Sequence, residues 1–192
     1  MINLTIMFVA GMVIGHGSPV KDDVGVDAGQ FMVDERGKLV VYKSDALASD
    51  ANFITMREQL TTFLLTKGNE ITRTTAARLE STGSVPMEKH AGIGNYVAGE
   101  IHYTLVLENN AGEINYWFTD LRYQPYRNDR FGKRARATAT PIPLEKKFSK
   151  MNEQVWKKQK NYAYDAIEAL ADDVLGQLET AGKTKVVTTA MD

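Results

Sequence analysis

The sequence predicts an α+β domain, an antiparallel sheet of about four to six strands packed by two helices, and three patterns carry this prediction. Apolar residues recur at spacings of three and four over residues 53–64, the period of an amphipathic helix. Apolar and polar residues alternate over residues 101–118 on both sides of a turn, as in a half-buried antiparallel hairpin. A second helical stripe runs through residues 144–178. With 192 residues, 43% of them hydrophobic and 24% charged, the chain can form one well-packed domain.

Residues 1–17 are expected to be a secretory signal peptide, because they hold a short apolar run without charge. Leu4–Gly15 spans 12 residues, whereas a membrane-crossing helix needs roughly 20. Gly15 and Gly17 are small residues just ahead of a possible cleavage point before Ser18. No Lys or Arg precedes Leu4, so a buried N-terminal strand is the alternative. Export predicts a periplasmic or cell-surface protein that is not transmembrane and, lacking cysteine, not a Cys-anchored lipoprotein.

Residues 18–29 are polar and contain Gly and Asp, which is typical of a linker. We expect a single domain over residues 30–182. Its first elements are short extended pieces at 30–34 and 38–43, separated by a turn. The first helix follows a cap at Ser49 or Asp50 and ends at Gly68.

Glycine and proline divide the next part of the chain. Ile71–Thr82 predicts an exposed or edge strand that Gly83 breaks, and Val85–Met87 predicts a short piece that its proline confines to an edge. Ala91–Gly99 is expected to be a loop. The hairpin then turns at residues 109–112, whose Asn and Gly tolerate positive φ.

The C-terminal third predicts a loop and a long helix. Arg122–Pro143 lacks periodicity and holds three of the five prolines, so we expect a long surface loop. A helix is expected over residues 144–182, followed by a flexible tail at 183–192. Its apolar stripe comprises Leu144, Phe148, Met151, Val155, Tyr162, Ile167, Leu170, Val174 and Leu178.

The closing strand of the hairpin, Tyr116–Tyr123, and the Pro143-Leu144-Glu145 sequence at the start of the last helix resemble the family called domain of unknown function 4468. Gly37–Val40 is similar to the opening strand of that family, and the likeness covers residues 31–123. The resemblance implies export from a Gram-negative gut anaerobe and a TBP-like fold, a curved antiparallel sheet with helices on one side. It implies no activity and no functional residues.

Charge is unevenly distributed along the chain, although its formal net charge is −1. Residues 122–160 hold 12 of the 23 Lys and Arg but only 3 of the 24 Asp and Glu, which gives +9 there and −10 elsewhere. Such an asymmetry indicates a surface that meets an anionic partner, or self-association. The candidate binding residues are Arg127, Arg130, Lys133, Arg134 and Arg136, with Tyr123 and Tyr126 interleaved.

Three interpretations of this basic segment are open. It can be a solvated loop, a binding surface for an acidic envelope component such as lipopolysaccharide, acidic glycan or protein, or a nucleic-acid surface. Nucleic acid is the least favoured partner, because a TBP-like fold does not transfer function and an exported protein rarely meets DNA. Arginine forks bind phosphate and carboxylate, and aromatic rings stack on sugars or bases.

The predicted last helix is lysine-rich in its first half and acidic in its second, the reverse of what the helix dipole favours. We interpret this as an antiparallel helix pairing, either in a homodimer through residues 144–182 or with acidic parts of the same chain.

No nucleophile, nucleotide-binding or metal motif occurs, so we expect no cofactor and no metal. His90 and His102, with Glu88 or Glu100, are the only basis for a small hydrolase or metal-dependent enzyme, which is the alternative. The preferred hypothesis is a non-enzymatic binding or structural module of the cell envelope that uses residues 122–160.

Overall fold

The computed structural model describes residues 31–45, 53–91, 94–110, 113–128, 130–131 and 133–183. The expected signal peptide, the linker, and all of the expected tail except residue 183 lie outside these residues.

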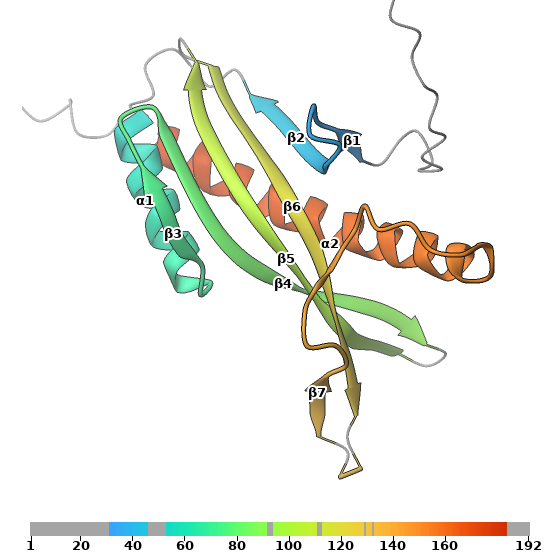
Figure 1. Ribbon diagram of the computed structural model, residues 1–192. Coiled ribbons are helices and arrows are strands. Elements are labelled where there is room, and N and C mark those ends of the chain that lie inside the picture. The colour runs from blue at the N-terminus through green and yellow to red at the C-terminus, as the bar shows by residue number, and fades with distance from the viewer. Residues whose placement is uncertain are drawn as a thin grey trace, which may run out of the picture.

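The strands of the described residues form one eight-stranded sheet in which every pairing is antiparallel. Its order is β1-β2-β6-β5-β4-β3, and β7 and β8 pair with β6 (Figure 1). The strands are β1 (Met32–Val33), β2 (Leu39–Asp45), β3 (Glu70–Thr74), β4 (Arg78–Ala91), β5 (Gly94–Asn110), β6 (Glu113–Asn128), β7 (Arg134–Arg136) and β8 (Ile142–Pro143).

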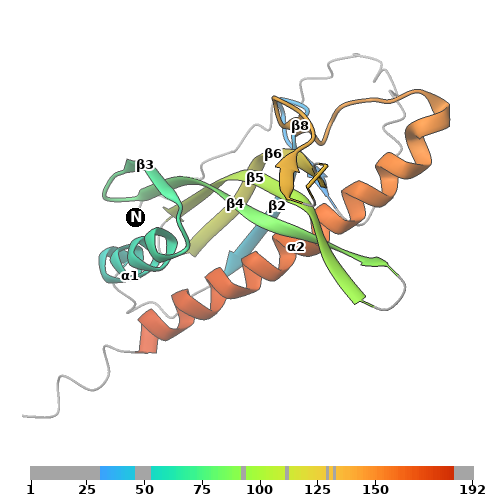
Figure 2. The same cartoon turned by 90° about the horizontal axis from the view of Figure 1, so that it is seen from below.

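Two helices, α1 (Phe53–Thr66) and α2 (Lys150–Lys183), lie on the same side of this sheet (Figures 1 and 2). Each helix has an apolar stripe, because its buried residues recur at helical spacing. Helix α1 ends at Thr66, and Gly68, two residues later, has a φ of 81°, a left-handed conformation that favours glycine after a helix. The predicted α+β class, with an antiparallel sheet, two helices and a long C-terminal one, is therefore confirmed.

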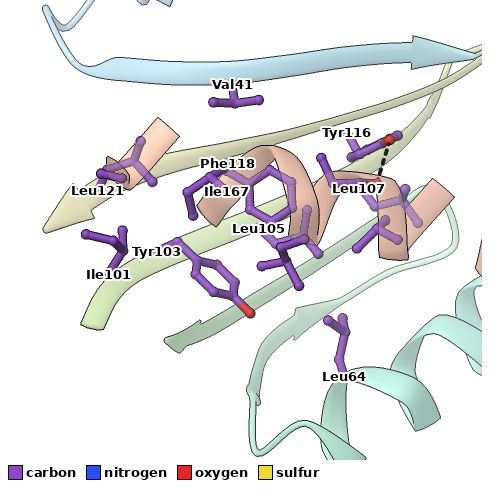
Figure 3. Packing of buried hydrophobic residues seen from close by; sticks show 14 of the residues in the cluster. Val41, Leu64, Ile101, Tyr103, Leu105, Leu107, Tyr116, Phe118, Leu121 and Ile167 are labelled. Carbon is purple, nitrogen blue, oxygen red and sulfur yellow. Dashed lines mark hydrogen bonds between the residues drawn. The ribbon is translucent and has the colours of Figure 1, made fainter. Parts of the chain in front are cut away.

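The core lies between the helices and the inner face of β2, β4, β5 and β6 (Figure 3). Phe118 on β6 and Leu105 on β5 are at most 1% exposed, and Ile167 of α2 is fully buried with them. Full burial of such side chains contributes roughly 1.5–3 kcal/mol each. Tyr116 donates its hydroxyl to the carbonyl oxygen of Ala171 at 3.1 Å, so the ring is buried without leaving its polar atom unpaired.

The predicted surface loop at Arg122–Pro143 is wrong in its first half, because β6 continues to Asn128 and β7 and β8 follow. Pro125 suggested a break but is tolerated. In an antiparallel strand the N and O of one residue point to the same side, and the Pro125 oxygen accepts the Ala137 amide at 2.8 Å, away from β5. The missing N–H of Pro125 therefore costs no bond to β5.

Strand β4 is continuous through Gly83 and Pro86, where the sequence predicted two separate pieces. Pro86 lies beyond the last residue of β4 that pairs with β3, so one side of β4 is an edge there. The predicted loop at Ala91–Gly99 is also wrong, since β5 begins at Gly94 and pairs with β4 from its first residue.

Helix α2 begins at Lys150, six positions later than the predicted start at Leu144. Leu144 is fully buried, and its amide donates to the Leu121 carbonyl at 3.0 Å, so this residue extends the sheet contact rather than the helix. Its burial accounts for the apolar spacing that predicted a helix there. Neither described helix holds an apolar stretch of the length needed to cross a bilayer.

Candidate functional site

The face of the sheet opposite the helices has a broad groove of about 550 Å³ with a largely polar lining. Its lining includes Thr82, Ser84, His102, Thr104, Asp120 and Arg122 from β4, β5 and β6. Ser84, His102 and Arg122 stand side by side on adjacent strands, because Ser84 pairs with His102 and His102 with Arg122. The groove can therefore hold a polar group between hydroxyls, an imidazole and an exposed guanidinium.

A β-bulge at Asp120 shapes this face. The register between β5 and β6 shifts between His102 and Thr104, and Asp120 has a φ of 52°, which is rare for a residue with a side chain. The extra residue keeps both Phe118 and Leu121 in the core, since without it their side chains would point to opposite faces. Asp120 itself turns to the surface, where Lys38 Nζ lies 3.6 Å from its carboxylate.

Glu100 on β5 gathers several polar groups at the far end of the groove, and we call Ser84, Glu100, His102 and Arg136 the Glu100 cluster. The Glu100 carboxylate lies 3.1 Å from His102 Nε2 and 3.6 Å from Arg136 Nη2, and it accepts the Ser84 hydroxyl at 3.4 Å. Burial, together with a hydrogen bond to Glu100, raises the pKa of Tyr126. The cluster therefore connects the outer face of β4 and β5 to β7.

The predicted cationic residues lie on a two-stranded extension of the sheet, which we call the basic arm (residues 126–136). It consists of the end of β6 and of β7, and it extends away from the rest of the sheet (Figure 1). Its exposed Lys and Arg side chains are Arg127, Arg130, Lys133, Arg134 and Arg136. A hairpin brings them together because residues 127 and 135, and residues 128 and 134, face each other across it.

Most arm arginines face no described carboxylate. In the part of the chain that the structure describes, only Arg136 of the arm arginines makes an ion pair, with Glu100. Arg130 lies over the Phe131 ring at 4.7 Å, and Arg134 lies over the Tyr126 ring at 5.8 Å. These cation–π contacts orient the two guanidinium groups. The exposed arginine side chains therefore place positive charge at the surface of the arm.

Of the two tyrosines predicted to take part in binding, only Tyr126 is placed to do so. Tyr126 is half-buried at the base of the arm. Tyr123 is 6% exposed, and its hydroxyl donates to the Ala98 carbonyl at 3.2 Å. Burial, and to a lesser extent the nearby Tyr96, raises the pKa of Tyr123 to about 12. The prediction that Tyr123 belongs to the binding surface is wrong, because its side chain points from β6 into the core.

The histidines of the alternative enzyme hypothesis occupy different parts of the sheet. Ser84 is the β4 partner of His102, whereas His90 lies six residues further along β4 and pairs with Asn95. Six residues of an extended strand span roughly 20 Å. Among the described residues, no group of three or more His, Asp or Glu side chains is arranged to hold a metal ion. His102 and Glu100 remain a histidine–carboxylate pair without His90.

The remaining lysines of residues 122–160 lie just before α2 and in its first turns. Lys146, Lys147, Lys150 and Lys158 are exposed, while burial lowers the pKa of the half-buried Lys160. Met151 and Val155 were expected in the buried stripe, but they are 87% and 59% exposed. Trp156, at 9% exposed, takes the inward position instead, two helical turns before the fully buried Ala163. The predicted stripe is therefore one position out of phase in the first turns of α2.

The fold is similar to two solved structures. A DUF4468 family protein from Bacteroides ovatus matches with a TM-score of 0.54 at 16% identity, over 85% of this chain and 96% of the other. A TBP-like protein from Parabacteroides distasonis matches with a TM-score of 0.55 at 12% identity, over 76% of this chain and 96% of the other. No family model and no curated protein matches the sequence. The chain therefore shares the fold of a DUF4468 family protein and of a TBP-like protein, as the hairpin residues indicated.

Proposed function

We propose that this chain is a non-enzymatic binding module of the cell envelope that engages an anionic partner through the basic surface at residues 122–160. The observation that carries the proposal is the basic arm. Its five cationic side chains are all exposed on a projecting hairpin, and Arg136 also pairs with Glu100: Arg127, Arg130, Lys133, Arg134 and Arg136.

The proposal follows from where the opposite charges lie. The acidic half of α2 contacts basic residues of the folded core, since Glu168 pairs with Lys43 and Asp173 with Lys67. The arm projects beyond these contacts, so its charge is available to a partner (Figure 1). Exposed charges attract a partner of opposite sign over about 10 Å at 0.1 M salt, which makes such binding sensitive to ionic strength.

Location in the envelope is part of the proposal and rests on the apolar run Leu4–Gly15. N-terminal sequencing of the protein recovered from a periplasmic or secreted fraction tests it. A mature chain that begins near Ser18 supports export. A chain that retains Met1 and stays in the cytoplasm contradicts it.

Binding is tested with heparin as a soluble polyanion, by titration between about 50 and 500 mM NaCl. The variant Arg130→Glu/Lys133→Glu/Arg134→Glu is expected to lose at least about tenfold in affinity at low salt. The control Arg57→Glu/Lys67→Glu/Arg73→Glu changes the net charge equally at the opposite end of the molecule and is expected to retain most of the binding. Equal losses in both variants would show that net charge, and not the arm, governs the interaction.

The same preparation tests the enzyme alternative, which rests on the His102–Glu100 pair in the groove. A hydrolase assay with ester, phosphoester and peptide probes is expected to show no activity that His102→Gln removes. Activity lost in His102→Gln but kept in the arm variant would replace the binding proposal with a catalytic one.

A further inference from the structure

Three of the most exposed large apolar side chains lie inside the basic region. Met151 is 87% exposed, Phe131 72% and Val155 59%. Single exposed apolar residues are ordinary on protein surfaces, and this chain has others, such as Leu65 on α1. What distinguishes these three is that each lies in a stretch of the chain rich in Lys and Arg.

Phe131 is at the tip of the basic arm. Together with Arg127, Asn128, Arg130 and Ala135 it lines a shallow hollow of about 450 Å³. The Arg130 guanidinium lies 4.7 Å from the centroid of the Phe131 ring. The exposed apolar ring therefore has positively charged arginine side chains next to it.

Met151 and Val155 are a pair of exposed apolar side chains in the first turns of α2. They are four residues apart, so they are neighbours on one helix face. Lys158 follows Val155 by three residues on the same helix, which brings its ammonium group near this face, and the exposed Lys150 adjoins Met151 in the sequence. The opposite side of this segment is fixed by Trp156, whose ring packs on Phe148 at 4.7 Å. The first turns of α2 project beyond the sheet at the end opposite to α1 (Figures 1 and 2).

Two classes of anionic partner make different demands on this surface. A soluble polyanion, such as an acidic polysaccharide, is bound by charge and gains little from methionine and valine. A bilayer of anionic lipid attracts Lys and Arg to its phosphate layer and also takes up apolar side chains at the boundary between headgroups and acyl chains. Lys and Arg reach the headgroups while adjacent apolar groups go deeper.

We propose that the basic arm and the first turns of α2 bind the surface of an anionic phospholipid bilayer, with Phe131, Met151 and Val155 entering the headgroup region. This rests on the proposed function, because it names the partner of the same basic surface. The apolar side chains insert among the lipid headgroups, and the nearby Lys and Arg side chains make the protein prefer anionic lipid.

The test is co-sedimentation of the full chain with vesicles of phosphatidylcholine alone or with phosphatidylglycerol added. Binding is expected only to the anionic vesicles. Met151→Ser/Val155→Ser and Phe131→Ser are each expected to weaken vesicle binding about tenfold, because partial burial of these side chains is lost. Heparin binding by Met151→Ser/Val155→Ser is expected to change less than about twofold, because these two uncharged side chains lie outside the basic arm. Ile54→Ser/Leu65→Ser removes comparably exposed apolar side chains from α1 and is the control, with both affinities unchanged.

Each result has a separate meaning. Heparin binding without vesicle binding overturns the lipid inference and leaves the proposed function standing. Vesicle binding that is unchanged in both apolar variants overturns the insertion of these side chains. Failure to bind either probe at low salt overturns the proposed function as well. A dimer in light scattering that Met151→Ser/Val155→Ser converts to a monomer would assign this helix face to self-association, and the lipid inference would be rejected.

Discussion

Arg136 Nη2 lies 3.6 Å from Glu100 Oε1, and this ion pair joins the basic arm to the outer face of β5. The Glu100 side chain is 16% exposed, whereas that of Arg136 is 65% exposed. The carboxylate is therefore fixed by its neighbours His102 and Ser84, and the guanidinium is largely in water. A pair of this kind positions the arm without stabilising it greatly.

A double-mutant cycle of Arg136→Gln and Glu100→Gln measures that contribution. We expect a coupling free energy below about 1 kcal/mol in urea unfolding, because solvent screens one partner. Glu100→Gln should also strengthen heparin binding slightly, since it removes a negative charge beside the arm. A coupling of several kcal/mol would mean that the arm depends on this pair for its fold.

Glu168 on α2 makes stability depend on pH in the acidic range. Burial of its carboxyl would raise the pKa, but hydrogen bonds from Lys43 at 2.6 Å and from Tyr164 outweigh this and lower it below 4.5. A carboxyl with a depressed pKa stabilises the fold above its unfolded pKa, and this stability is lost as the pH falls through the folded pKa. Glu168→Gln should therefore lower the free energy of unfolding by about 1 kcal/mol at neutral pH.

The difference between Glu168→Gln and the wild type is expected to shrink as the pH falls below 4.5 and to vanish once the wild-type carboxyl is protonated. Urea unfolding across acidic and neutral pH measures it. Asp172→Asn removes an exposed carboxylate from the same helix and is the charge-matched control. A Glu168→Gln effect that is constant with pH would contradict the assignment to charge.

Gly83 is required by close packing on β4. A Cβ atom there would lie 1.5 Å from Asn69 Oδ1 and 2.8 Å from the Tyr103 hydroxyl. Asn69 Oδ1 accepts that hydroxyl at 2.8 Å inside the core, so Gly83→Ala must break a buried hydrogen bond. We expect a loss of about 2–3 kcal/mol in urea unfolding. Gly176→Ala, at an open helical position, should instead stabilise by about 0.5–1 kcal/mol; equal effects would contradict this packing.

Truncation of Phe118 should destabilise the protein far more than truncation of Phe131. Phe118 is fully buried, with the Tyr103 ring at 5.4 Å, so Phe118→Ala is expected to cost about 3–5 kcal/mol. Phe131 is 72% exposed, so Phe131→Ala should change stability by less than about 0.5 kcal/mol. Thermal and urea unfolding compare them. A large loss in Phe131→Ala would show that the arm tip supports the fold.

The elements that sequence reasoning located well are those whose signal is local. The apolar stripe over residues 53–64 predicted α1, which ends at Thr66, two residues before the predicted Gly68, and the alternation of residues 101–118 predicted β5 and β6. The errors occur where residues distant in the sequence determine the local structure. Pro125 and Gly83 are strand breakers by local preference, yet the position of neighbouring strands makes both acceptable. Leu144 has helical spacing, but the Leu121 carbonyl holds it on the sheet.

The candidate site shows the same division. The concentration of Lys and Arg at 122–160 is visible in the sequence, and its exposed cations were named from it. The bulge at Asp120 is not visible in the sequence. A single inserted residue leaves the alternation on each side intact and only shifts the phase between the two sides. That shift decides that Tyr123 is inside and Arg122 outside. Met151 is likewise exposed because Trp156 and Ala163 set the inward face of α2, one position away from the predicted stripe.

The strand order has a consequence for how the chain acquires its structure. Strands β3 to β6 form successive hairpins, each pairing with the strand before it, whereas β2 pairs with β6 across the whole intervening sequence. Loop closure over that distance is slow compared with hairpin formation. We expect pulse-labelled amide exchange during refolding to protect Leu105 before Val41; earlier protection of Val41 would exclude this sequence of events. On the ribosome, β2 must wait for residues 113–128 to emerge, and until then its edge remains open to chaperones or to other chains.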